Sequence, residues 1–333
     1  MSHPEAVDDV VTPFGIVVVN FGSHALLARN LTPLDLESVP ARVVIVDNFK
    51  SAVDRRAITA LAAASGWTLH LMSRNLGFGA AVNVGIAAAA ELGCASYLML
   101  NPDVMITPSV LAELRAASLA QRQALITPVI ERPDGSVWFS GSRLSLDEGG
   151  IRPADRAPTE RRRAWLTGAC LAVHRDLWIR LGGFDEDYFL YWEDVDLSVR
   201  CADLGGSLVI RRDLVVVHDV GGTQHAGTSR AKSSVYYYYN CRNRLVFAAK
   251  YLSRADQIRW LLTTPRDLRR VVLRGGRRQL LRPRQSAWPA IKGAVAGIRV
   301  LARSWSARSN GTDVRPAEPA STHDQPAEVR KGW

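Results

Sequence analysis

Residues 182–200 read GGFDEDYFLYWEDVDLSVR, and this stretch carries three carboxylates within four positions. Glu193, Asp194 and Asp196 stand between apolar residues, so burial raises their pKa values while the three charges repel one another. A folded protein keeps such a cluster when a cation, a metal ion or a proton compensates it. The alternative is a solvated acidic first turn of a helix, whose positive dipole end favours carboxylates.

The composition is that of a globular protein with a substantial core. Of the 333 residues, 47% are apolar, which predicts one large domain or two modest ones. The four cysteines show neither close pairing nor metal-site spacing, so we expect no disulfide framework, no structural zinc and a reducing, cytoplasmic setting. The N-terminus lacks an apolar core, and no apolar run approaches the roughly 18 residues of a spanning helix. We therefore expect neither a signal peptide nor an integral membrane segment.

Positive charge is concentrated in one region of the chain. Residues 254–308 carry 14 Lys and Arg against 2 Asp and Glu, whereas residues 1–253 are almost neutral. Apolar residues recur there at helical spacing: Ile258, Leu261, Leu262, Leu268, Val271, Val272, Ile291, Ala294, Val295, Ile298, Leu301 and Ala302. Such a segment is typical of peripheral attachment to an anionic membrane surface, where each nearby cation contributes about 1 kcal/mol. The charge alone also permits nucleic-acid binding, but no nucleic-acid motif accompanies it, so we expect no nucleic-acid partner.

Short apolar, β-branched runs predict buried strands of a parallel sheet that is covered by helices on both faces. The expected strands are residues 16–20, 42–48, 67–72, 95–100, 124–130, 207–210 and 214–217. Residues 21–24, after the first run, lack the glycine spacing of a dinucleotide-binding turn, which argues against a Rossmann oxidoreductase. Residues 145–163 are rich in Asp, Glu, Gly, Pro and Arg, and this composition predicts a mobile loop.

Polar residues follow these strands at the edge where open α/β sheets bind their ligands. Asp47 can accept a hydrogen bond from the imide N–H of a pyrimidine base, with Asn48 beside it; an Asx turn or a helix cap is an equally good explanation. The loop 75–79, NLGFG, runs into an Ala-rich helix that contains Asn83. Its glycines allow the backbone to approach a ligand, and the helix start offers free N–H groups to an anion.

Two further strand ends offer candidate metal ligands. Asp103 in Asn101-Pro102-Asp103 is the kind of single carboxylate that holds a divalent cation already chelated by a diphosphate, although the tripeptide is also a good turn. His218 is a second candidate ligand, and the alternative is a hydrogen-bonded interior histidine. Beyond it, residues 235–244 open a helix whose tyrosines and arginines, Arg242 among them, line an acceptor groove or pack in the core.

Taken together, these motifs resemble the inverting family 2 glycosyltransferases of the GT-A fold, and most closely their bacterial rhamnosyltransferase-like branch. The resemblance covers roughly residues 14–250 and keeps the order of the family's motifs. Its matching blocks are residues 46–48, 75–79 with Asn83, 101–104, 167–170, 183–186, 192–196, His218 and 239–244. It implies a GT-A fold, a Rossmann-like mixed sheet flanked by helices that binds a nucleotide, followed here by a basic helical extension.

The resemblance also implies roles for residues at the matching positions. Asp194 is the expected general base, and sequence alone does not rank it against Glu193 and Asp196. Asp103 and His218 are the expected ligands of Mg²⁺ or Mn²⁺. The residues expected to bind the nucleotide are Asp47, Asn48, Asn75, Gly77, Gly79, Asn83 and Asn101. The residues expected to bind the acceptor are Thr167, Gly168, Trp192 and Arg242. Asn101 stands where many relatives carry the first acid of an Asp-x-Asp motif, which leaves metal binding to Asp103 and His218.

The implied reaction transfers a sugar, with inversion, from a nucleoside diphosphate to a polyprenyl-diphosphate-linked or saccharide acceptor, in cell-wall or surface polysaccharide synthesis. The expected donor is dTDP-rhamnose or a UDP-sugar, which leaves galactofuranosyl or other hexosyl transfer as an alternative. A nucleotidyltransferase or a sugar-nucleotide hydrolase is a rival enzyme of the same fold, but the carboxylate cluster favours transfer. A catalytically silent nucleotide-binding scaffold at the membrane is a rival of another class.

The same resemblance divides the chain into four parts. We expect a flexible N-terminus over 1–13, a catalytic domain over 14–252, a helical extension over 253–308 and a disordered tail over 309–333. The expected location is the inner face of the cell membrane, where the basic extension would meet anionic lipid.

Overall fold

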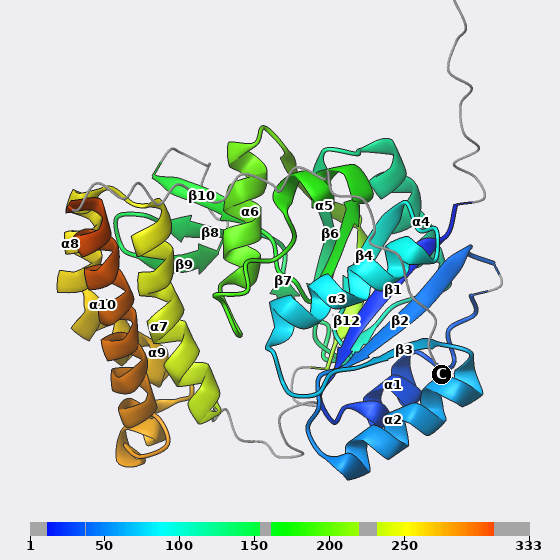
Figure 1. The fold of residues 1–333 in the computed structure, drawn as a ribbon, viewed down its shortest axis with the longest axis horizontal. Helices are drawn as coiled ribbons and strands as arrows, with labels where there is room; N and C mark the ends of the chain where they lie inside the picture. Colours follow the sequence, from blue (N-terminus) through cyan, green and yellow to red (C-terminus); the bar gives the residue numbers. More distant parts are fainter. Residues whose placement is uncertain (1–11, 37, 154–160, 220–231, 310–333) are drawn as a thin grey trace, which may run out of the picture.

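A computed structural model of the protein describes residues 12–36, 38–153, 161–219 and 232–309. The flexible N-terminus and disordered tail expected from the sequence lie almost wholly outside these residues. Within them, strands form a nine-stranded mixed sheet and a separate three-stranded sheet, and helices surround both (Figure 1).

The order of strands in the main sheet is β3-β2-β1-β4-β11-β6-β12-β5, with β7 added beside β6. Its strands are β1 Phe14–Asn20, β2 Ala41–Asp47, β3 Thr68–Leu71, β4 Ser96–Leu100, β5 Val104–Met105, β6 Ala124–Glu131, β7 Val137–Phe139, β11 Cys170–His174 and β12 Ser207–His218. The small sheet has the order β10-β8-β9 and consists of β8 Ser142–Ser145, β9 Gly150–Pro153 and β10 Arg162–Trp165.

The first four strands in chain order are parallel, as their continuous apolar runs predict, and β11 then inserts antiparallel between β4 and β6. The two short strands expected at 207–210 and 214–217 are one strand, β12. Its register shifts between Arg211 and Val215, so a bulge keeps both halves paired with β6. The carboxyl ends of β1, β2 and β4 share one edge of the sheet.

Ten α-helices lie in the described parts of the chain, and α2, α4, α5, α7 and α8 begin at a side-chain cap. They are α1 His24–Asn30, α2 Ala52–Ser65, α3 Phe78–Glu91, α4 Pro108–Ala120, α5 Arg175–Leu181, α6 Glu193–Asp203, α7 Ser234–Tyr251, α8 Arg254–Leu262, α9 Thr264–Leu273 and α10 Ala287–Ser309, with a 3₁₀ turn at Arg277–Leu281. Ser51 caps α2 by accepting a hydrogen bond from the Asp54 N–H. Gly85 lets α3 lie close on the sheet, since a Cβ there would stand 2.4 Å from Val17 Cγ1.

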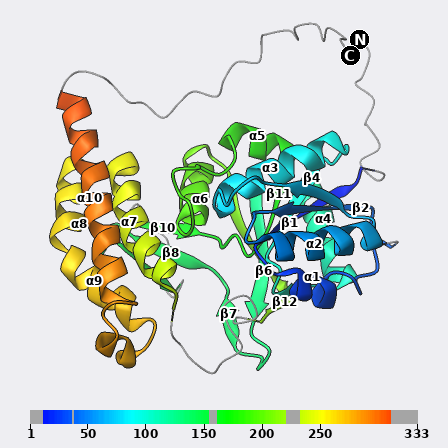
Figure 2. The same ribbon diagram turned by 60° about the horizontal axis from the view of Figure 1, so that its bottom comes forward.

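Helices α7 to α10 gather at one end of the molecule, with the small sheet between them and the main sheet (Figures 1 and 2). The stretch 145–163, expected as a loop, contributes β9 and β10 to that sheet, and residues 154–160 lie outside the described residues. The buried Arg244 of α7 connects the loop before β9 with α8, because its Nε donates to Gly149 O at 2.7 Å and its Nη1 to Trp260 O at 3.0 Å. The basic extension is thus packed against α7.

Part of the apolar spacing in the extension serves this internal packing. Val271, Val272, Ala294 and Leu301 are buried, and the first three pack with Tyr237. The apolar side chains that remain exposed in α8 and α10 are Ile258, Leu262, Trp288, Ile291, Val295 and Ile298. Across the part of the chain that the structure covers, we find no helix with the length and hydropathy needed to cross a membrane.

Candidate functional site

The glycine loop before α3 packs directly against the stretch that carries the acidic cluster. Gly77 has a φ of 93°, and a Cβ there would stand 2.1 Å from Phe189 O, so only glycine fits. The next residue, Phe78, donates its N–H to the same carbonyl at 2.9 Å. Asn48 holds the loop from the other side, because its Nδ2 donates to Asn75 Oδ1 and to Gly77 O, both at 2.9 Å. The nucleotide-side candidates Asn48, Asn75 and Gly77 therefore form one hydrogen-bonded unit.

Asp47 lies at the end of β2, fully buried, with both carboxylate oxygens already engaged. Asn20 Nδ2 donates to Oδ1 at 3.0 Å, and Arg55 Nε donates to Oδ2 at 2.8 Å. It caps no helix, since Ser51 does so for α2. In this structure Asp47 accepts hydrogen bonds from Asn20 and Arg55, and its side chain has no exposed surface. Direct contact of Asp47 with a nucleobase stays a prediction.

Three other nucleotide-side candidates lie at backbone junctions. Asn83, on α3, donates through Nδ2 to Phe184 O and accepts from the Phe184 N–H, each at 2.9 Å. This amide therefore joins α3 to the turn after Gly183. Gly79 lies at the same junction, where a Cβ would come within 3.0 Å of the Phe184 Cβ. Asn101 follows β4, and its N–H donates to Ala169 O at 2.8 Å.

The two predicted metal ligands are brought together. His218 Nε2 lies 2.9 Å from Asp103 Oδ1, both side chains are buried, and β5 beside Asp103 pairs with the end of β12. Trp138 packs edge-on against the imidazole at 4.5 Å between ring centroids. The Nδ1 atom of His218 is buried without a hydrogen-bond partner among the residues described. One carboxylate and one imidazole fit a divalent cation that takes its other ligands from a diphosphate and water. A set of three or more such protein ligands does not occur in the described ranges.

The acidic residues of 182–200 are compensated in different ways. Asp185 and Asp187 pair with Lys250 of α7, the latter at 2.7 Å. Asp196 is fully buried between two partners, Arg200 Nε at 2.7 Å and the Tyr251 hydroxyl at 2.6 Å. Asp196 was a candidate base, but its oxygens are committed to this internal ion pair.

Glu193 and Asp194 have no cationic partner within hydrogen-bond distance in the described chain. Burial, with the neighbouring Asp194 and Asp196 charges, holds the pKa of Glu193 well above its ordinary value, and its Oε2 has no partner among the described residues. The raised pKa favours the protonated form of this carboxyl. Burial also raises the pKa of Asp194, to about 6, against the hydrogen bonds it accepts from the backbone N–H groups of Gly168 and Val195. Asp194 is thus ionised at neutral pH and remains a good proton acceptor.

A short hydrogen-bonded chain connects Asp194 with the end of β4. Gly168 donates its N–H to Asp194 Oδ2 at 3.3 Å, and the adjacent Ala169 accepts from the Asn101 N–H at 2.8 Å. Asp103 lies two residues beyond Asn101. These hydrogen bonds link the segment that carries the base candidate to the segment that carries Asp103, although Asp103 and Asp194 are far apart in the sequence.

The turn before Asp194 has an unusual backbone. Tyr191 and Trp192 both have positive φ, 66° and 78°, a conformation that costs on the order of 1–3 kcal/mol for such residues. Asn243 of α7 supports the turn, because its buried Nδ2 donates to Leu190 O at 3.0 Å and to Tyr191 O at 2.7 Å. Sequence reasoning did not single out Asn243. Its signal was faint: an asparagine within the matching block 239–244.

The acceptor-side candidates lie around this turn. Thr167 is buried, and its Oγ1 accepts from the Ala169 N–H at 3.3 Å. Arg242 donates to Asp187 O at 2.9 Å, so in this structure it holds the loop. Trp192 is 5% exposed, and its ring packs with Phe247 and Trp260 in a second apolar cluster. Direct acceptor contact through Thr167, Trp192 or Arg242 stays a prediction.

Comparisons with known proteins find glycosyltransferases, although no protein-family model matches the sequence. The chain is 34% identical over 231 residues to the N-acetylglucosaminyl-diphospho-decaprenol L-rhamnosyltransferase of Mycobacterium tuberculosis, covering 61% of this chain and 75% of the relative. It is 23% identical over 233 residues to the dTDP-rhamnosyl transferase RfbF of Shigella flexneri, covering 67% and 76%. The solved structure of GalNAc-T7 with UDP, GalNAc and Mn²⁺ aligns with a TM-score of 0.57 at 14% identity, over 90% of this chain and 58% of that chain. This last likeness concerns the fold alone.

Proposed function

The chain belongs to the rhamnosyltransferase-like family of GT-A glycosyltransferases, and on that premise we propose that it transfers rhamnose, with inversion, from dTDP-rhamnose to a polyprenyl-diphosphate-linked saccharide. Its mixed sheet flanked by helices is the fold expected of such an enzyme. The M. tuberculosis relative is named for a decaprenol-linked N-acetylglucosaminyl diphosphate, and the S. flexneri relative for dTDP-rhamnose. A chain related to both is expected to use substrates of these two classes.

The observation that carries the proposal is the state of Asp194. Of the three clustered acids in α6, Asp196 is paired with Arg200, and the raised pKa of Glu193 favours its protonated form. Asp194, with a pKa of about 6 and no cationic partner in the described chain, is the acid best suited to accept a proton at neutral pH. An acceptor hydroxyl becomes an effective nucleophile when a base removes its proton as the new glycosidic bond forms. Asp194 takes that proton in our proposal. A base with a pKa of about 6 is ionised at neutral pH and still basic enough to share a proton in the transition state.

The donor side of the site is built by Asp103, His218 and the loop before α3. Asp103 and His218 would hold a Mg²⁺ or Mn²⁺ ion. When bound, the ion stabilises the negative charge that builds on the departing nucleoside diphosphate. Asn48, Asn75 and Gly77 hold the loop that approaches the nucleotide. Attack by the acceptor on the face opposite the diphosphate inverts the anomeric centre, and Asp194 serves that face from the α6 side.

A lipid-linked acceptor lies at a membrane, and the exposed apolar side chains of α10 could contact that membrane. Trp288, Ile291, Val295 and Ile298 lie on one stripe of α10 at i, i+3, i+7 and i+10 spacing, and each is more than a third exposed. We propose that this stripe, together with the arginines of the preceding 3₁₀ turn, rests on an anionic inner leaflet. The double variant Ile291→Asp/Val295→Asp should then cosediment far less with anionic liposomes than the wild type, with its turnover of a water-soluble acceptor unchanged. Equal sedimentation of the two proteins would contradict membrane attachment through α10.

Donor choice is the direct test of the proposed reaction. The protein is screened by thermal shift against dTDP-rhamnose, UDP-galactofuranose and other UDP-hexoses, with and without Mn²⁺, and then assayed with an N-acetylglucosaminyl-diphospho-polyprenol. We expect the largest Tm increase with dTDP-rhamnose plus Mn²⁺, and a product one deoxyhexose heavier by mass spectrometry. Transfer from UDP-galactofuranose alone would contradict rhamnose as the donor sugar and identify the protein as a galactofuranosyltransferase. Absence of transfer from every nucleotide sugar would contradict the proposed function.

A further inference from the structure

A small cationic cluster lies beside the acid-bearing turn. Arg274, just after α9, donates through Nη1 to the Tyr236 hydroxyl at 3.2 Å. The ammonium of Lys232 lies over the ring of the same tyrosine, 5.8 Å from its centroid. Tyr236 in turn packs edge-on against Tyr191, with ring centroids 5.2 Å apart. Two cations from separate segments of the chain therefore converge on one tyrosine next to the turn that leads into Asp194.

Neither of these two cations pairs with a carboxylate in the described parts of the chain, whereas Arg270, one turn earlier on α9, is neutralised by Asp267. Burial, with the positive charges of Arg274 and Arg132, lowers the pKa of Lys232. Lys232 is half-buried and Arg274 is exposed. Their like charges repel, so an anion bound between them would relieve that repulsion.

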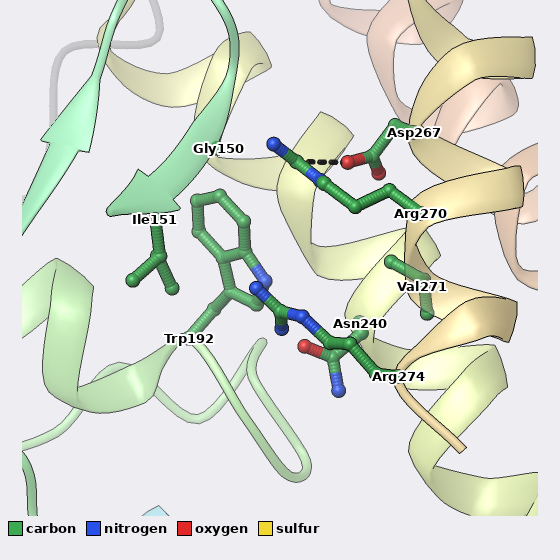
Figure 3. A pocket seen from close by; sticks show the side chains of 8 residues that line it. All are labelled: Gly150, Ile151, Trp192, Asn240, Asp267, Arg270, Val271 and Arg274. Atoms are coloured by element: carbon green, nitrogen blue, oxygen red, sulfur yellow. Dashed lines mark hydrogen bonds and ion pairs between the residues drawn. The ribbon is translucent and has the colours of Figure 1, made fainter. Parts of the chain in front are cut away.

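Of this cluster, Arg274 also lines a small pocket, together with the ion-paired Asp267 and Arg270. Figure 3 shows the side chains of Arg270 and Arg274 reaching from the α9 side toward the ring of Trp192, with the Asn240 amide beside Arg274. Gly150 and Ile151 of β9 close the opposite wall. Trp192 is the residue immediately before α6, which carries Asp194. An anion held by Arg274 and Lys232 would therefore lie close to the residues that present the proposed base.

We propose that Lys232, Arg274 and the Tyr236 hydroxyl form a diphosphate-binding subsite, distinct from the Asp103–His218 pair. The inference rests on the proposed function, which supplies two diphosphates: that of the sugar donor and that of the lipid-linked acceptor. The position favours the acceptor. The subsite is built by α7 and the end of α9 beside the acid-bearing turn, and α10, whose exposed stripe would meet the lipid, packs on both helices. The Arg274 guanidinium and the Lys232 ammonium can only donate toward a phosphate, and the Tyr236 hydroxyl, which accepts from Arg274, can donate its own proton as well. Charge-assisted hydrogen bonds from the two cations are the strong ones.

The first test measures binding of inorganic pyrophosphate in EDTA, which removes any contribution from a metal ion. The proteins are the full chain, Lys232→Gln/Arg274→Gln, and the control Arg269→Gln, an exposed arginine of α9 that does not line the pocket. Calorimetry should show pyrophosphate binding that is weakened on the order of tenfold or more in the double variant, as expected from the loss of charge-assisted hydrogen bonds. The control should bind like the wild type. Equal binding by all three proteins, or none by the wild type, overturns the subsite.

Steady-state kinetics with both substrates then assign the diphosphate. A higher KM for the lipid-linked acceptor, with an unchanged KM for the donor, assigns the subsite to the acceptor's diphosphate. The reverse pattern assigns it to the donor's diphosphate, and both patterns support the subsite. Unchanged KM values for both substrates in the double variant overturn it. If the wild type transfers no sugar at all, the proposed function fails. Pyrophosphate binding then still shows whether the subsite exists, so the two failures can be told apart.

Discussion

Replacing Glu193 by glutamine separates the roles of the two neighbouring acids. Burial raises the pKa of Glu193 well above its ordinary value of 4.5 and so favours the neutral carboxyl, which glutamine matches in charge and nearly in size. Turnover should therefore stay within about twofold of the wild type. The acid limb of the pH–rate profile should remain near pH 6, because it reports Asp194. With a pKa of about 6, the rate at pH 5 is about a tenth of the plateau.

The same variant should be more stable than the wild type in alkali. In the wild type, the folded state keeps a proton on Glu193 that the unfolded state releases above pH 4.5, so this group's contribution to stability is lost as pH rises toward the folded pKa. Because glutamine does not ionise, the variant avoids this loss. Its free energy of unfolding in alkali should be higher by about 1.4 kcal/mol for each unit by which folding raises the pKa of Glu193. Single-turnover rates from pH 5 to 8.5, with thermal melts over the same range, test both statements. An inactive Glu193→Gln variant, or one whose acid limb has vanished, would refute the assignment of the two acids.

Three further changes test other parts of the site. Asn243→Ala should lower kcat about tenfold or more and leave the donor KM unchanged, because the strained turn before Asp194 loses the two hydrogen bonds that support it. Asn243→Asp should have an equally low kcat, because its side chain has no N–H donor. Full activity in either variant would show that Asn243 does not position the turn. Arg200→Gln should lower the free energy of unfolding by about 3 kcal/mol, measured by urea denaturation, because it leaves Asp196 buried without its cation; a loss below about 1 kcal/mol would contradict this. Asp103→Asn should abolish the Mn²⁺-dependent part of donor binding in the thermal-shift assay, and an unchanged Mn²⁺ response would exclude it as a metal ligand.

The strands and the edge that carries the ligands could be predicted because apolar runs and their polar ends are local features. The run before Asp47 and the run before Asn101 each became a strand of the main sheet with the expected direction. The bulge that joins the two halves of β12 was missed, since polar residues between two apolar runs also fit a turn. The loop expected over 145–163 was wrong in part, because β9 and β10 are stabilised by pairing with β8, a contact between distant residues.

Within the site, the sequence located the acidic cluster but not the state of each acid. It predicted that a cation, a metal or a proton compensates the charges. The structure places a cation beside Asp196, and burial raises the pKa of Glu193, which favours its protonated form. The i, i+4 spacing of Asp196 and Arg200 was a usable signal for the first. The raised pKa of Glu193 depends on burial of one side of α6, and no short window of sequence reveals that burial. The support from Asn243 was likewise hidden, because that residue lies about fifty positions beyond the turn it holds.

The central claim is that Asp194 removes the acceptor's proton while Asp103 and His218 serve the donor from the same site. The most direct measurement compares Asp194→Asn with the wild type in two assays, turnover of the complete reaction and affinity for the nucleotide sugar in the presence of Mn²⁺. We predict that turnover falls by roughly 10²–10⁴-fold, as expected for loss of a general base, while donor affinity stays within about twofold. Turnover above about a tenth of the wild-type rate, or a matching loss of donor affinity, would contradict the claim.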